Sequence, residues 1–149
     1  MIRFDSGVDV LRPVDEVWAY ASDVTKQDEW SNAVQSIRLL TPGPVRQGTR
    51  YVQTVKMLGK QAEGEWEVTE FEPNRRITFR GGSGPMRMSW SMILEPIDGG
   101  TRIIAPGQCE PGGFFKVAAP ILRRAMKRQA DGDFATLKDL LEARAAVPA

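Results

Sequence analysis

The stretch "MRMSWSMIL" at residues 86–94 carries an apolar side chain at every second position. A period of two is typical of a β-strand that buries one face and exposes the other. Methionine and tryptophan are unusual on such a face, because valine and isoleucine are among the residues enriched in strands. The stretch therefore predicts a strand, and its composition raises the question of what these large side chains contact.

The same period recurs on both sides of this stretch and predicts a series of neighbouring strands. These strands are expected over residues 2–11, 34–43, 48–58, 61–71, 76–81 and 101–110. Turn signals such as Gly59-Lys60 and "IDGG" at 97–100 separate consecutive strands, which is typical of antiparallel hairpins. Pro106 indicates a sheet edge or a bulge in the last strand, since proline cannot donate to a strand ladder.

Other segments have the period of a helix. Residues 12–24, "RPVDEVWAYASDV", begin with a proline followed by an acidic pair, which suits a first helical turn. A second short helix is expected over 26–30, with Thr25 as its cap. From Pro120 to Leu141 apolar side chains recur at three- and four-residue spacing, which predicts a C-terminal amphipathic helix of about twenty-five residues.

The order of these elements predicts an α+β fold, since the strands come mostly in one run and the long helix follows them. An antiparallel sheet of this kind has one apolar face and one polar face. The C-terminal helix is the only predicted element large enough to cover the apolar face. A chain of 149 residues is expected to form a single domain, here over 1–149.

The amino-acid composition excludes several kinds of active site. The sequence has no histidine and one cysteine, Cys109. Ser-His-Asp triads, Cys-His pairs and histidine-based zinc sites are therefore excluded, and catalysis would need carboxylates, tyrosine, lysine, arginine, the cysteine or bound water. Nucleotide-binding motifs are absent too. We expect no metal and no cofactor, and an inert, buried Cys109.

The charge and hydropathy of the chain bear on its partners and location. A net charge of +1 gives no reason to expect a nucleic-acid partner. No apolar run approaches the ~18–20 residues of a membrane helix, so we expect no stable membrane insertion. The charged N-terminus does not resemble a signal peptide, and a single cysteine suits a reducing compartment, so a cytoplasmic location is expected. The oligomeric state stays open.

Several motifs follow one another along most of the chain. They are "RPVDEVWAYASDVTKQDEWSNAVQSI" at 12–37, "GPVRQGTRY" at 43–51, "EVTEFEPNRRITFR" at 67–80, "LEPIDGGTRI" at 94–103 and "DFATLKDLLEAR" at 133–144. In this order they resemble the START-like, or SRPBCC, helix-grip superfamily, and within it the polyketide cyclase/dehydrase-like proteins. The resemblance implies a curved antiparallel sheet gripping the C-terminal helix, with an elongated cavity between them. Members of this superfamily bind lipids, sterols, polyketides, quinones or hormones there, and a few are cyclases or aromatases.

The apolar face of the predicted sheet is the main candidate site. A stripe of methionine and aromatic side chains is more often a packed core, but methionine also recurs at promiscuous binding surfaces. Small residues beside Trp66 leave space, and apolar walls with a few polar groups describe a small-molecule pocket. Together with the resemblance, these features favour a pocket. The residues expected to line it are Trp30, Tyr51, Gln53, Val55, Ala62, Gly64, Trp66, Phe79, Met86, Met88, Trp90, Met92, Phe114, Phe115, Leu122 and Met126.

Two expectations about these side chains can be checked directly. Along 86–92, the methionine and tryptophan side chains should point toward the long helix, while Arg87, Ser89 and Ser91 point away. Trp30 is expected either to contact a ligand near the mouth of the pocket or to pin the second short helix to the sheet.

Charged clusters outside this face are expected to be solvated. The basic segment 123–128, "RRAMKR", is expected to be a solvated helix face; the alternative is a site for an acidic ligand or a lipid headgroup. The acidic row of Glu63, Glu65 and Glu67 should lie on the outer face of the sheet, where Arg50 and Arg102 are expected to pair with it.

The favoured function is binding of a hydrophobic or amphipathic small molecule of lipid, polyketide, quinone or aromatic type. The first alternative is a cyclase, dehydratase or aromatase that uses Tyr51 as general acid or base and Gln53 to orient its substrate. The second is an interaction module whose cavity has collapsed. Tyr51 is the only proton-transfer group that clearly points inward by pattern, which favours the binding protein.

Overall fold

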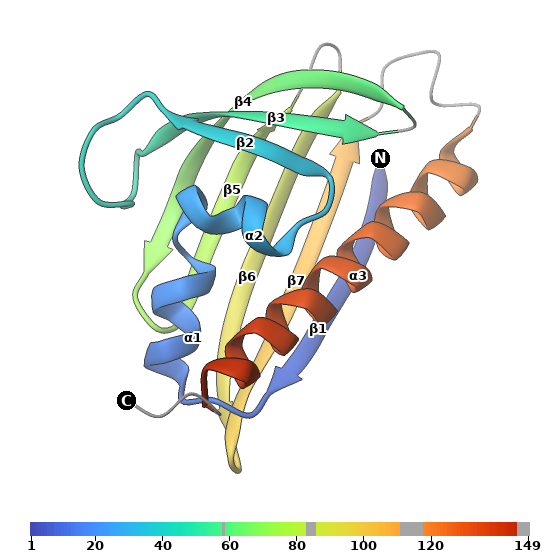
Figure 1. Ribbon diagram of the computed structural model, residues 1–149. Coiled ribbons are helices and arrows are strands. Elements are labelled where there is room, and N and C mark those ends of the chain that lie inside the picture. The colour runs from blue at the N-terminus through green and yellow to red at the C-terminus, as the bar shows by residue number, and fades with distance from the viewer. Residues whose placement is uncertain (58, 83–85, 111–117, 146–149) are drawn as a thin grey trace.

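The computed structural model describes the chain except for residues 58, 83–85, 111–117 and 146–149 (Figure 1). Seven strands form one antiparallel sheet in the order β1-β7-β6-β5-β4-β3-β2, so β1 and β2 are its edges. The strands are β1 (Ile2–Val10), β2 (Val34–Leu39), β3 (Arg50–Met57), β4 (Lys60–Glu72), β5 (Arg76–Gly82), β6 (Arg87–Ile97) and β7 (Gly100–Glu110). In Figure 1, β2, β3 and β4 cross the view at a steep angle to β6 and β7, which shows how strongly the sheet curves.

The helices all lie on the concave side of this sheet. They are α1 (Val14–Ala21), the short 3₁₀ helix η1 (Val24–Lys26), α2 (Gln27–Trp30) and α3 (Ala119–Ala145). Figure 1 shows α3 running beside β1, with α1 and α2 on its other side. The α+β helix-grip architecture predicted from the sequence is confirmed.

The connection between α1 and α2 differs from the predicted one. Thr25 does not cap α2. Asp23 precedes η1, and its carboxylate accepts a hydrogen bond from the Thr25 amide at 3.1 Å and another from the Thr25 hydroxyl at 2.6 Å. A carboxylate at this position satisfies amide groups that the first helical turn leaves without partners.

Pro106 lies at neither an edge nor a bulge, contrary to the expectation from sequence. β7 sits between β1 and β6, and its pairing register with each of them is constant. Pro106 is paired with Asp5 of β1. In the ladder to β6, the pair Trp90–Gly107 is followed directly by Ile93–Ile104, so Pro106 is not paired with β6. The sheet thus accommodates the missing amide hydrogen by interrupting one ladder without shifting it.

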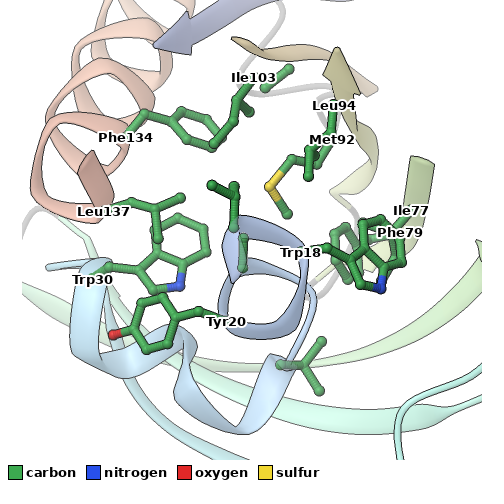
Figure 2. Packing of buried hydrophobic residues seen from close by; sticks show 14 of the residues in the cluster. Trp18, Tyr20, Trp30, Ile77, Phe79, Met92, Leu94, Ile103, Phe134 and Leu137 are labelled. Carbon is green, nitrogen blue, oxygen red and sulfur yellow. The ribbon is translucent and has the colours of Figure 1, made fainter. Parts of the chain in front are cut away.

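Aromatic rings join α3 to the sheet and to α2. Phe134 of α3 lies 6.4 Å from Trp90 of β6 and 5.7 Å from Trp30 of α2, measured between ring centroids. Figure 2 shows Phe134 and Leu137 projecting from α3 toward the side of the core that holds Met92 and Ile103. The apolar stripe predicted for the C-terminal helix is therefore confirmed.

Lysine side chains of α3 cover the free edge of β1. Lys127 Nζ donates to the carbonyl oxygen of Asp5 at 2.9 Å, and Lys138 Nζ donates to that of Asp9 at 3.0 Å. An edge strand presents unpaired carbonyl groups that invite another strand. These ammonium groups occupy them and at the same time fix α3 along β1.

We expect Leu137→Ala to lower the free energy of unfolding by about 2–5 kcal/mol, because truncating a buried leucine leaves a cavity. The Leu137 side chain is 0% exposed, whereas Ile121 on the same helix is 72% exposed. Ile121→Ala is the matched control and should change the free energy by no more than about 0.5 kcal/mol. Urea denaturation measures both, and equal effects would contradict the packing described for α3.

Candidate functional site

The side chains of β6 face the directions predicted from their alternation. Met88, Trp90 and Met92 pack with the core between the sheet and α3, and the Trp90 ring stacks on Phe79 at 4.6 Å. On the opposite face Arg87 is exposed and Ser91 shares a hydrogen bond of 2.8 Å with Thr78. The unusual residues of this strand therefore belong to the inner face of the sheet.

A row of inner-face residues crosses six strands in register. From β3 to β1 it consists of Tyr51, Trp66, Gly81, Met88, Cys109 and Ile2. A Cβ atom at Gly81 would lie 2.7 Å from Cδ2 of Trp66 and 2.3 Å from the carbonyl oxygen of Glu65. Only glycine at this position lets the indole of Trp66 lie against β5.

A second row runs parallel to the first. Phe79, Trp90, Gly107 and Phe4 are successive partners across β5, β6, β7 and β1. A Cβ atom at Gly107 would lie 2.4 Å from Cζ of Phe4, so the Phe4 ring covers this glycine. Together the two rows form a surface of aromatic and methionine side chains, in which Trp66 lies against Gly81 and Phe4 lies against Gly107.

The inner face is closed along one half of α3 and partly open along the other. Tyr51, Trp66, Phe79 and Met92 are buried, as are Phe134, Leu137 and Leu141 of the C-terminal half of α3. Around the N-terminal half of α3, by contrast, several inner-face residues are only half-buried. They are Val55, Ala62, Met86, Met88 and Trp90, and Leu122 of α3 itself is half-buried as well.

Most of the predicted site residues lie either in the buried part of the inner face or in its half-buried part. Met86, Met88 and Leu122 pack against a satellite cluster formed by Met126, Ile2 and Cys109. Gly64 is buried and is the cross-strand partner of Gln53. Phe114 and Phe115 lie outside the described residues.

Trp30 of α2 packs against α3, within a core cluster that also contains residues of the sheet. Its side chain is 3% exposed and lies against Phe134. Among the residues that the structure describes, its indole Nε1 has no hydrogen-bond partner. Figure 2 shows the ring beside Leu137 and Tyr20.

The surroundings of Gln53 and Tyr51 limit the contacts and proton transfers that these polar inner-face residues can make. Gln53 Nε2 donates to Oε1 of Gln27 at 3.2 Å, and both amides are buried, so this contact holds α2 to β3. Burial raises the pKa of the Tyr51 phenol well above its usual value. Loss of hydration disfavours the phenolate, which suits Tyr51 to donating a hydrogen bond rather than to accepting a proton.

Asp133 is a functional candidate that the sequence reasoning did not select. Its carboxylate is buried on α3 and accepts hydrogen bonds from Ser31 Oγ at 2.7 Å, the Asn32 amide at 3.2 Å and Gln129 Nε2 at 2.8 Å. Burial raises the pKa of Asp133, and the three hydrogen bonds partly oppose that rise. A sequence signal was present, because position 133 falls on the apolar stripe of the helix, four residues before Leu137.

Two hollows open at the surface near these groups. One, of about 460 Å³, lies at the sheet. Its lining includes the outer-face residues Arg80, Arg87, Ser89 and Gln108 and the inner-face residues Gly81, Met88 and Cys109. The other, of about 400 Å³, lies on the flank of α3. It is lined by Asn32, Ile121, Arg124, Ala125, Arg128, Gln129 and Gly132.

The charged side chains of the outer face only partly match the predicted pairs. Arg50 forms an ion pair with Glu65, as expected. Arg102 instead pairs with Asp9 of β1 at 2.9 Å. The sheet order explains the difference, because β7 neighbours β1 and is separated from β4 by two strands.

Cys109 is buried, and burial raises the pKa of its thiol, as an unreactive cysteine requires. Within the described ranges, no group of three or more Cys, Asp or Glu side chains is placed to hold a metal ion. None of the described helices is long and apolar enough to span a membrane.

Comparison with known proteins adds a family and a set of similar structures. Residues 1–142 match the model of a family described as polyketide cyclase / dehydrase and lipid transport. Toxin Rv0910 of Mycobacterium tuberculosis is 26% identical over 102 residues, which cover 68% of this chain and 71% of the relative.

Solved structures resemble the whole described fold. TTHA0849 from Thermus thermophilus superposes with a TM-score of 0.79 at 17% identity, covering 95% of this chain and 98% of the other. The Zhui aromatase/cyclase from Streptomyces sp. R1128 gives a TM-score of 0.77 at 17% identity, covering 96% and 94%. At these identities the likeness shows the fold alone.

We expect the stability of the protein to depend on pH through Asp133. Its pKa in the folded state is raised above the ordinary value of 3.8, so the folded protein holds the proton more tightly than the unfolded chain. The stabilising contribution is complete below the unfolded pKa and is lost as the pH rises through the folded pKa. The unfolding free energy of the wild type minus that of Asp133→Asn should therefore fall as the pH rises above the ordinary carboxyl pKa of 3.8.

Denaturation curves at several pH values measure this difference. Asp139→Asn, which removes an exposed carboxylate from the same helix, controls for the loss of one negative charge. A difference for Asp133→Asn that stays constant or grows with pH would contradict the prediction.

Proposed function

Because this chain belongs to the polyketide cyclase/dehydrase and lipid transport family, we propose that it binds a hydrophobic or amphipathic small molecule between the inner face of the sheet and α3. The START-like superfamily predicted from sequence motifs is confirmed by the same match. The ligand class proposed here covers lipids, polyketides, quinones and related aromatic compounds.

The observation that carries the proposal is the half-buried apolar surface beside the N-terminal half of α3. Met88 and Trp90 point inward and pack against the core, yet neither is fully buried. A bound molecule that covered this surface would gain about 0.8 kcal/mol for each CH₂ group removed from water. The flexible, polarisable methionine side chains can adjust to the shape of such a molecule.

The buried parts of the inner face set the limits of the proposed site. The packed contact of Phe134 with Trp90 and Trp30 closes it toward the C-terminal end of α3. In this proposal the rings of Trp66 and Phe79 form its floor, and the cross-strand pair Val55 and Ala62 forms one wall. Polar groups are few, which is typical of pockets for small apolar ligands.

The enzyme alternative lacks a suitable base on the described part of the inner face. Tyr51 is buried with a raised pKa, which favours the protonated phenol. Asp133 accepts three hydrogen bonds from its neighbours and holds α3 to the α2–β2 turn. These arrangements favour binding over proton transfer. The remaining alternative, an interaction module with a collapsed cavity, calls for burial of Met88 and Trp90, and both are half-buried.

We expect Ala62→Trp to weaken binding of an uncharged hydrophobic probe, N-phenyl-1-naphthylamine, by at least about tenfold, or about 1.4 kcal/mol. Ala62 is a half-buried inner-face residue next to Val55, so the indole should occupy the space proposed for the ligand. Fluorescence titration gives the dissociation constants.

Glu63→Trp is the matched control, because Glu63 is the next residue on β4 and is exposed on the outer face. It should leave probe affinity unchanged. The proposal fails if the wild type shows no saturable binding of the probe, or if both tryptophan variants bind it as the wild type does.

A further inference from the structure

We propose that the hollow on the flank of α3 binds the anionic head group, a carboxylate or a phosphate, of an amphipathic ligand. The proposal rests on the function proposed above, because the apolar part of the same ligand would occupy the inner face of the sheet. It specifies the class of ligand as an amphipathic anion.

The hollow lies on one of two differently built flanks of α3. On the first flank, Lys127 and Lys138 donate to carbonyl oxygens of β1, so that flank is closed. On the second, Gln129 lines the hollow together with Asn32, which follows α2. The hollow therefore lies between α3 and the turn that connects α2 to β2.

Two arginines give this hollow a positive charge. Arg124 and Arg128 are four residues apart and so lie on the same side of the helix, about one turn from each other. Within the described residues neither forms an ion pair, whereas Lys127 pairs with Asp131 and Lys138 with Glu142. Guanidinium groups match carboxylates and phosphates through paired hydrogen bonds.

The polar wall of the hollow is held in place by hydrogen bonds. Gln129 donates to Asp133 at 2.8 Å, and the amide of Asn32 donates to the same carboxylate at 3.2 Å. Ser31 completes the arrangement with a bond of 2.7 Å. Asp133 is thus a positioning residue, and a wall fixed before binding reduces the entropic cost of holding a ligand.

Small residues leave room for a head group. A Cβ atom added at Gly132 would meet no atom within 4 Å, so this stretch of α3 borders open space. Ala125 lines the same hollow about two turns earlier, and Ile121, 72% exposed, offers an apolar contact at its far end.

The proposed ligand has to pass from the hollow to the apolar site along α3. On α3, Gln129 lies three residues after Met126 and so on the same side of the helix, and Met126 packs in the satellite cluster. Met88 and Leu122 contact this cluster and are half-buried. In this proposal, an acyl chain whose head group is held at Arg128 passes beside Leu122 and reaches the inner face at Met88.

The other surface hollow is less suitable, although Arg80 and Arg87 also border it. Its polar side chains belong to the outer face of the sheet, although the inner-face residues Gly81, Met88 and Cys109 also line it. It also contains the carboxylate of Glu110.

The test compares dodecanoate with its methyl ester, which has the same chain but no charge. The wild type should bind the carboxylate at least about tenfold more tightly than the ester, as one charged hydrogen-bonded contact allows. Arg128→Gln should remove most of this preference and leave the affinity for the ester unchanged. Arg123→Gln removes the same charge from an exposed position outside the hollow and should preserve the preference.

A second variant tests the space independently of charge. Gly132→Leu should keep the helix folded, because leucine favours helices by comparison with glycine. Its side chain should fill the hollow and lower carboxylate affinity to that of the ester. Affinity for N-phenyl-1-naphthylamine, which needs only the inner face, should not change.

Three outcomes would overturn the inference: equal wild-type affinities for dodecanoate and its ester, equal effects of Arg123→Gln and Arg128→Gln, or carboxylate preference that survives Gly132→Leu. Binding to phosphatidylglycerol vesicles that depends on Arg123 as much as on Arg128 would assign these residues to a membrane surface instead. If the naphthylamine probe binds while dodecanoate shows no preference, only this inference fails. If the wild type binds neither probe, the proposed function fails with it.

Discussion

The contact of Phe134 with Trp90 and Trp30 is the interaction on which the rest of the structure depends. It joins the long helix, the centre of the sheet and the short helix α2 at one point. Each aromatic pair of this kind contributes about 0.5–1.5 kcal/mol beyond the burial of its surface. On the C-terminal side of this point α3 lies tightly on the sheet, and on the N-terminal side the inner face is only half-buried. One cluster of rings thus stabilises the fold and also marks where the proposed site ends.

Polar contacts hold the two flanks of α3 in different ways. Ammonium groups of Lys127 and Lys138 reach the backbone of β1 on one side, and the Asp133 carboxylate collects three donors on the other. Neither set of contacts requires the helix to press on the central strands near its N-terminal end. Apolar side chains there remain half-buried although the helix is fixed along most of its length.

Much of the fold could be predicted because period and order are local properties of a sequence. The alternation in β6 indicated which of its side chains face inward, and the stripe ending at Leu141 indicated the helix that covers them. The rows across the sheet could not be predicted, since they depend on register. Register shifts occur between Val34 and Ser36 and between Val68 and Glu70, and nothing in the sequence marks them. Asp133 was overlooked because a carboxylate on a helix usually faces solvent, although its position on the apolar stripe distinguished it. The single domain, the cytoplasmic location and the ligand contacts stay predictions.

The glycines of the inner face affect how this family member can change over time. Gly81 lies against Trp66 and Gly107 lies under Phe4, and in each case backbone or ring atoms occupy the place of a Cβ atom. Neither position can accept a larger residue while its aromatic neighbour remains. Divergence in ligand preference must therefore be concentrated on the exchangeable side chains of β6 and α3, such as Met88 and Leu122. A few side chains of β6 and α3 can therefore vary, whereas the two glycines beneath the aromatic rings have little freedom to change.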